Sequence, residues 1–196
     1  GFGVMYFADA MLKNHNTELK DKIVVVSGFG QVSYGVVKKA VDFGAKVVTL
    51  SGPDGYIYDK DGVSGEKILY MEKLRDTNDD VIKPYAEKYG VDFHKDKKPW
   101  EVKCDIAIPC AIQNELVKED AEALIANDCK FMVEGANMPC SEEALNLFKQ
   151  NNVVIAPSKA ANAGGVAVSA LEMRQNAGWD KWGFHAVDKK LHQIMK

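Results

Sequence analysis

The 196-residue sequence has few cysteines, and their spacing excludes the usual disulfide and metal frameworks. Cys104, Cys110, Cys129 and Cys140 form no Cys-x-x-Cys pair, so we expect free thiols in a reducing, cytoplasmic setting. The four histidines are scattered and form no His-Glu-x-x-His motif. We therefore expect no metal site.

A surplus of basic charge and long apolar runs are also missing. The net charge of −3 lacks the basic excess of a nucleic-acid-binding surface. No apolar run approaches the roughly 20 residues that span a bilayer. The sequence begins with Gly-Phe-Gly instead of Met and has no basic leader or cleavage site, so we expect no signal peptide and a longer parent chain. We predict neither a nucleic-acid nor a membrane partner.

What the chain does have is a hydrophobic content of 46%, enough for the core of one ordinary domain. Apolar periodicity predicts strands that alternate with helices. This order predicts an α/β fold of the Rossmann type, a doubly wound, mostly parallel sheet with helices on both faces. The expected strands are 23–28, 45–52, 104–110, 130–135 and 153–158, with a short ribbon at 53–62; the expected helices are 4–13, 31–43, 65–76, 79–90, 118–128, 141–151 and a broken helical tail at 163–196.

A Gly-x-Gly turn follows the first predicted strand directly. Gly28 would make the tight turn, and Gly30 would let the backbone approach a pyrophosphate at the N-terminus of the following helix. The third fingerprint position is Ser33, which is small but is neither Gly nor Ala. A plain strand-to-helix turn remains the alternative interpretation of this motif.

The second predicted strand ends in Ser-Gly-Pro-Asp-Gly at 51–55. Gly52 stands where a NAD-binding unit usually offers an acid to the ribose, and Asp54 follows two places later. The stretch predicts a β-turn whatever else it does. Its functional interpretation is one wall of an adenosine pocket.

Three further strand ends are rich in amides or glycine. The sequences CAIQNE (110–115) and EGANMP (134–139) place amide side chains just past strands, which favours a ligand-facing role over loop stabilisation alone. In KAANAGGVAVS (159–169), the two glycines favour a loop that a small ligand approaches closely. The acidic pairs 79–80, 119–120 and 142–143 are interpreted as helix caps, not as acid–base groups.

At these loops the sequence resembles the glutamate dehydrogenases, specifically the small-subunit hexameric bacterial type. The stretches that carry the resemblance are SGFGQV, SGPDGYIYD, KPWEVKCDIAIPCAIQNE, VEGANMP and APSKAANAGGVAVSALEMRQNA, in family order across nearly the whole chain. The resemblance implies a second domain that binds the nicotinamide cofactor, without the domain that carries the catalytic lysine and aspartate. Residues 1–20 would then be the connecting helix and 21–196 the NAD(P)-binding domain, with no catalytic residue in this chain.

The resemblance also implies roles for individual residues. The family commonly has Asn at the position of Gln31, Ala at Ser33 and Thr at Ile112, so polar contacts at these places are altered. Cofactor binding is expected of Gly28, Phe29, Gly30, Gln31, Val32, Ser51, Gly52, Pro53, Asp54, Ala111, Ile112, Asn114 and Asn137; substrate binding is expected of Asn162, Val166 and Ser169.

The implied activity is reversible oxidative deamination of glutamate to 2-oxoglutarate and ammonia, in a homo-hexameric parent enzyme. We expect NAD to be favoured, with NADP possible, because Asp54 would repel a 2′-phosphate and neither Arg75 nor Arg174 is near it in sequence. One alternative is a dehydrogenase of an apolar amino acid, against which the hydroxyl of Ser169 argues. The other is a non-catalytic NAD(H)-binding regulatory module.

Overall fold

A parallel sheet of short, β-branched strands lies at the centre of the molecule. The computed structural model describes residues 1–77 and 79–195, and within them five strands pair in the order β2-β1-β6-β7-β8. The strands are β1 (Ile23–Val26), β2 (Lys46–Val47), β6 (Ile106–Ile108), β7 (Phe131–Val133) and β8 (Val154–Ala156), all parallel to their neighbours. The predicted doubly wound sheet is confirmed.

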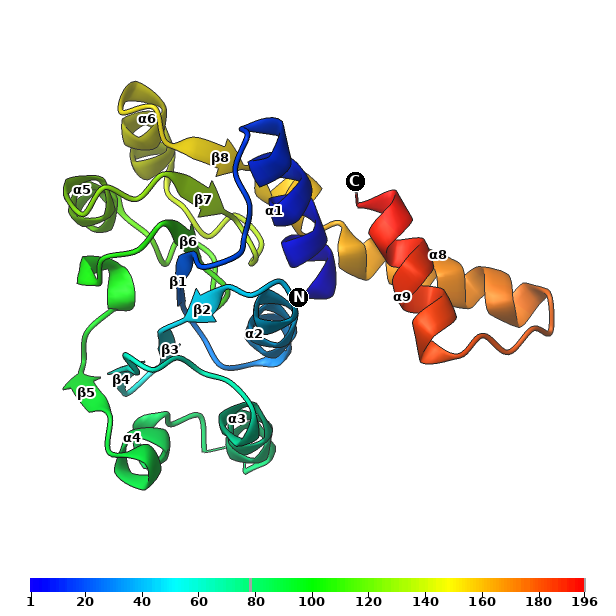
Figure 1. Ribbon diagram of the computed structural model, residues 1–196, viewed down its shortest axis with the longest axis horizontal. Coiled ribbons are helices and arrows are strands. Elements are labelled where there is room, and N and C mark those ends of the chain that lie inside the picture. Colours follow the sequence, from blue (N-terminus) through cyan, green and yellow to red (C-terminus); the bar gives the residue numbers. More distant parts are fainter. Residues whose placement is uncertain (78, 196) are drawn as a thin grey trace.

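Helices cover both faces of this sheet (Figure 1). On one face, α1 (Phe2–Asn14) and α2 (Gln31–Asp42) pack against alternate strand residues such as Val24 and Val26. On the other, α5 (Lys118–Ala126) and α6 (Glu142–Gln150) pack against the residues between them, such as Val25 and Ala107. Strands buried on both faces explain the continuous apolar runs in the sequence.

The second predicted strand, 45–52, is wrong as a single element. Only Lys46–Val47 pairs with β1, while β3 (Thr49–Gly52) turns away and forms an antiparallel sheet with β4 (Gly55–Tyr58) and β5 (Asp92–Lys95). The hydroxyl of Thr49 accepts from the amide of Val26 at 2.9 Å and donates to its carbonyl at 3.0 Å. These bonds satisfy polar groups at the edge of β1, so the chain can leave the parallel sheet without an unpaired backbone group there.

The antiparallel sheet is flanked by α3 (Glu66–Asp76) and α4 (Lys83–Tyr89), and a 3-10 turn, η1 (Pro99–Glu101), leads back to β6. The predicted helix 79–90 begins later than expected, with Pro84 in its first turn. Consequently Asp79 and Asp80 precede the helix and do not lie in its first turn, whereas the other acidic pairs lie in the first turns of α5 and α6. β5 and η1 were not predicted.

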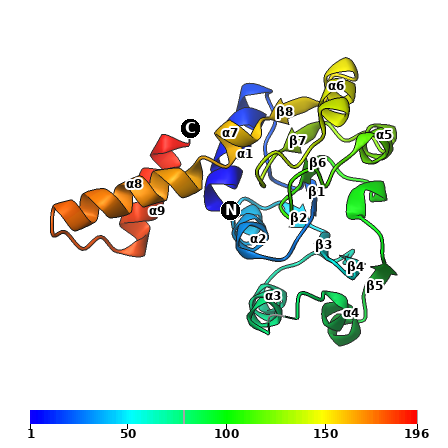
Figure 2. The ribbon, with the colours of Figure 1, turned by 180° about the vertical axis from the view of Figure 1, so that it is seen from behind.

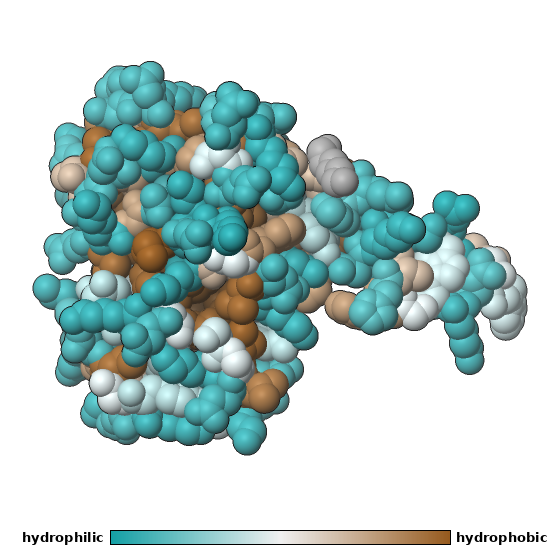
Figure 3. All heavy atoms as spheres, in the orientation of Figure 1, coloured by the Kyte–Doolittle hydropathy of each residue, from teal (hydrophilic) through white to brown (hydrophobic). Residues whose placement is uncertain are grey.

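The C-terminal part forms a helical arm that projects from the body (Figure 2). The arm comprises α8 (Gly164–Ala177) and α9 (Phe184–Ile194), while the short helix α7 (Ser158–Ala161) precedes it and packs against α1 in the body. The predicted tail ends at Lys196, which lies outside the described residues. Hydrophobic residues gather over the centre of the body, while the arm is mostly hydrophilic on this face (Figure 3). No described helix combines the length and the hydropathy needed to cross a membrane.

The two glycines at 164–165 lie in the first turn of α8, so the predicted loop is wrong as secondary structure, while the approach of a small ligand to them stays a prediction. A Cβ on Gly164 would lie 2.9 Å from the Cα of Gly3 in α1, closer than packed atoms allow. A Cβ on Gly165 would meet no described atom within 4 Å. Gly164 therefore serves the close approach of two helices.

This contact predicts different effects for two neighbouring substitutions. Gly164→Ala should lower the free energy of unfolding by about 1–3 kcal/mol, because the new methyl group presses on the backbone of α1. Gly165→Ala is the matched control and should be neutral or stabilising by up to about 1 kcal/mol, since alanine favours a helix. Urea unfolding of both variants measures this; equal stability of the two would contradict the packing explanation.

Candidate functional site

The glycine turn lies where the strand order of the parallel sheet reverses. β1 is an interior strand with β2 on one side and β6 on the other, so its carboxyl end opens a crevice of the kind in which such sheets bind ligands. Gly28 has a φ of +74°, and a Cβ there would lie 2.8 Å from the hydroxyl oxygen of Ser33. That hydroxyl donates to the carbonyl of Ser27 at 3.1 Å, so serine fits the third fingerprint position.

A cavity of about 580 Å³ opens at this crevice. Its volume lies within the range of small-molecule sites. Predicted cofactor residues from three strand ends come together in its wall: Gly28, Phe29, Gly30, Ser51, Gly52, Pro53, Ala111, Ile112 and Asn114. Gly30 is exposed, and a Cβ on it would meet no described atom within 4 Å, which leaves room for a ligand against its backbone.

Four predicted cofactor residues lie elsewhere among the described residues. Gln31 and Val32 line a second cavity of about 620 Å³ between α1, α2 and the arm. Asn137 is exposed in the loop after β7 and is not among the described residues that line the first cavity. Asp54 also lies outside that wall, and its hydrogen bonds explain why.

The carboxylate of Asp54 accepts from the amides of Ile82 and Lys83 at 2.9 and 3.0 Å. It therefore holds the start of α4 and is directed toward that helix. At Gly52 a Cβ would lie 2.7 Å from a carboxylate oxygen of Asp54 and 3.1 Å from the ring of Phe29. These contacts explain why no acidic side chain occupies the strand end.

The predicted substrate residues are spread along α7 and α8. The amide of Asn162 donates to the carbonyl of Ala136 at 3.2 Å, which ties the end of α7 to the loop after β7. Val166 has an exposed fraction of 76%, and Ser169 is exposed on α8. Their role in substrate binding stays a prediction, because neither lines the cavity at the glycine turn as described.

The cavity also contains residues that the sequence did not reveal: Arg75, Asp80, Lys97, Lys98, Pro99 and Glu115. Arg75 lies in the last turn of α3, far from the glycine turn in sequence, and one of its buried guanidinium nitrogens has no hydrogen-bond partner among the described residues. Asp80 has a φ of +50° in the loop before α4. The packing of α3 against α2 and α4 brings these segments to the glycine turn.

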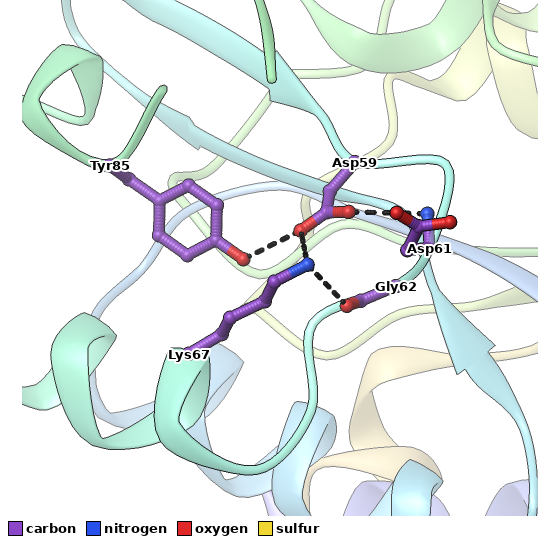
Figure 4. A network of polar contacts seen from close by, with 5 residues as sticks. All are labelled: Asp59, Asp61, Gly62, Lys67 and Tyr85. Atoms are coloured by element: carbon purple, nitrogen blue, oxygen red, sulfur yellow. Dashed lines mark hydrogen bonds and ion pairs between the residues drawn. The ribbon is translucent and has the colours of Figure 1, made fainter. Parts of the chain in front are cut away.

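A buried ionic network fixes that part of the wall (Figure 4). Asp59 follows β4 and is 1% exposed; it accepts from Lys67 of α3 at 2.7 Å and from the phenol of Tyr85 of α4 at 2.9 Å. Burial, and then the neighbouring Asp59, raise the pKa of Tyr85, so the phenol remains a donor. The carboxylate of Asp59 thus anchors α3, which carries Arg75, and α4, which follows Asp80.

A central parallel sheet, a glycine turn at its switch point and a ligand-sized cavity there together define the class of Rossmann-type nucleotide-binding folds. A sequence model of the glutamate/leucine/phenylalanine/valine dehydrogenases matches residues 1–196. The chain belongs to this dehydrogenase family.

The similar relatives include NAD-specific glutamate dehydrogenases of Bacteroides fragilis, 53% identical over 196 residues, and of Clostridium symbiosum, 49% identical over 197 residues. Each match covers 100% of this chain and 44% of the relative, so the chain spans less than half of their length. A solved glutamate dehydrogenase superposes with a TM-score of 0.97 at 48% identity, covering 100% of this chain and 44% of that one. The solved glutamate dehydrogenase of Plasmodium falciparum superposes with a TM-score of 0.96 at 41% identity, and the match covers 99% of this chain and 42% of that one.

Because the space beside Gly30 is open, a substitution there should weaken cofactor binding without lowering the stability of the fold. Gly30→Val should leave the melting temperature unchanged, because the side chain points into free space, and should abolish NADH binding by blocking the backbone. Gly28→Val is the contrasting variant: it should destabilise the fold, since its φ and its neighbours exclude a side chain. NADH fluorescence titration with thermal melting tests both; unchanged affinity in folded Gly30→Val would favour the plain turn.

Proposed function

We propose that this chain is the NAD(P)-binding part of a glutamate dehydrogenase. The observation that carries the proposal is the cavity at the glycine turn, where Gly28, Gly30 and the turn around Pro53 meet the Ala111–Asn114 turn. Family membership and the printed names of the relatives support glutamate as the amino acid, ahead of an apolar one. The boundary between a connecting helix at 1–20 and a cofactor domain at 21–196 stays part of the proposal.

The residues present fit a dinucleotide. The backbone at Gly30 is open to a pyrophosphate, and the unpartnered nitrogen of Arg75 supplies a positive group in the same cavity, judged on the described residues. Phe29 and Pro53 offer apolar surface for a base or ribose. α2 begins with Gln31 and Val32, and the backbone amides of its first turn, which have no partner within the helix, are directed toward the glycine turn.

When bound, a nicotinamide cofactor supplies the hydride chemistry of the reaction, here between glutamate and 2-oxoglutarate with ammonia. The part of this chain is to bind and orient the cofactor. Ala111, Ile112 and Asn137 would border its nicotinamide end, while Asn162, Val166 and Ser169 would face the substrate. We further propose a homo-hexameric parent enzyme in the cytoplasm, a location that the unpaired, buried state of all four described cysteines supports.

One premise of the cofactor preference needs correction. Arg75 is distant from the Ser51–Asp54 turn in sequence, but the fold places it in the same cavity wall as Pro53. It faces Asp76 at 3.3 Å and Glu72 at 3.8 Å, which offset part of its charge, and Asp80 lines the same wall. Relatives are named NAD-specific in Bacteroides fragilis and NADP-specific in Escherichia coli, so both cofactors occur at this level of similarity.

We expect NADH to bind more tightly than NADPH, by about tenfold, because Asp80 and the neighbours of Arg75 oppose a 2′-phosphate. Arg75→Ala should widen this ratio by weakening NADPH further, since the guanidinium is the group able to grip that phosphate. Arg174→Ala, on the exposed arm, is the control and should leave the ratio unchanged. Parallel titrations at the same low salt measure it; equal or tighter NADPH binding by the unsubstituted chain would contradict the preference.

The 196-residue chain should bind NADH and yet turn over no glutamate, because the resemblance places the catalytic lysine and aspartate in the other domain. NADH production at saturating glutamate and NAD tests this in a preparation whose NADH binding has first been measured. Turnover near ordinary enzyme rates would place the catalytic groups within this chain.

A further inference from the structure

The cavity at the glycine turn contains a carboxylate for which the proposed function has no use so far. Glu115 is partly buried and lies in the same wall as Gly28 and Gly30. An acidic group is unexpected here, because a pyrophosphate against the glycine turn brings further negative charge into the cavity. A reason for the carboxylate is found in its hydrogen bonds.

Glu115 accepts hydrogen bonds from the turn that precedes it. The amide of Ala111 donates to its carboxylate at 2.9 Å, and the amide of Ile112 and the hydroxyl of Ser27 donate as well. The same Ser27 hydroxyl accepts from the amide of Cys110 at 2.8 Å. The carboxylate therefore fastens the turn after β6 to the end of β1, across the switch point of the sheet.

This inference rests on the proposed function. We propose that Glu115 is a positioning residue of the cofactor cavity, whose carboxylate holds the Ala111–Ile112 backbone in the shape that receives the nicotinamide half of the dinucleotide. Ala111 and Ile112 are exposed, and Ile112 has an exposed fraction of 68%, so their own packing does not fix this turn. The hydrogen bonds of Glu115 fix it instead.

Binding should then be linked to a proton. Burial raises the pKa of Glu115, while the three hydrogen bonds and Lys98 oppose that rise. The other ionisable groups around it include Cys110 at the end of β6, Cys140 after β7, and Lys98 with its partner Asp120; Arg75, Asp80 and Lys97 line the same cavity. Burial raises the pKa of both thiols, so they stay neutral, and Glu115 and Asp80 are the carboxylates among the described residues that line this cavity.

The direction of the linkage follows from charge. A bound pyrophosphate disfavours the ionised carboxylate, so the pKa of Glu115 is higher in the complex than in the free protein. The complex therefore binds more protons, and NADH affinity should fall as the pH rises from the pKa of the free protein through that of the complex.

Two variants separate the hydrogen bonds of Glu115 from its charge. Glu115→Gln keeps an acceptor for the Ala111 amide but has no charge, so NADH affinity should match the unsubstituted chain at a pH below the titration of Glu115, exceed it about threefold at a pH above that titration, and lose its pH dependence. Glu115→Ala removes the acceptor, so affinity should fall about tenfold, or about 1.4 kcal/mol, at both pH values. NADH fluorescence titration, with thermal melting of each variant, gives these quantities.

Glu119→Gln is the matched control, an exposed acid outside this cavity wall among the described residues, and should behave as the unsubstituted chain. The inference is overturned if a folded Glu115→Ala variant binds NADH as well as the unsubstituted chain, or if Glu115→Gln fails to restore binding or keeps the original pH dependence. Absence of NADH binding by the unsubstituted chain would overturn the proposed function, and this inference with it.

Discussion

Hydroxyl groups hold the carboxyl end of β1, and the candidate site depends on them. Thr49 bonds both polar groups of the Val26 backbone, the hydroxyl of Ser51 accepts from the amide of Gly28 at 2.8 Å, and Ser27 accepts from the amide of Cys110. Side-chain hydroxyl groups thus bind backbone groups that a neighbouring strand would otherwise bind, at the point where the strands separate. Because these polar groups are satisfied, the glycine turn can lie in a fixed place beside a cavity instead of beside another strand.

The parallel sheet and the glycine turn could be predicted because their causes are local. Strands buried on both faces leave apolar runs, and a turn with positive φ leaves glycine at position 28. The antiparallel sheet could not be predicted in the same way, since the departure of β3 depends on the hydroxyl of Thr49 meeting β1. Arg75 and Asp80 enter the cavity through the packing of α3 against α2 and α4 and through the anchor at Asp59, so no sequence spacing could have found them.

The glycines at 164–165 show how one sequence pattern can have two structural causes. Gly164 closely approaches the backbone of Gly3 in α1, whereas Gly165 has open space beside it, and both glycines line the second cavity. Helix packing and ligand binding make the same demand on a residue, which is the absence of a side chain. Only the position of α1, which comes from packing over the whole chain, distinguishes the two.

The burial of the four cysteines has a practical consequence for studying the molecule. Their exposed fractions range from 2% to 7%, and burial raises the pKa of Cys110 and Cys140, so a thiol-directed dye reacts slowly with the folded chain. Trp179, between α8 and α9, is by contrast 95% exposed. A cysteine introduced there offers a chemically distinct handle at the far end of the arm, to which a dye can be attached without removing any native thiol.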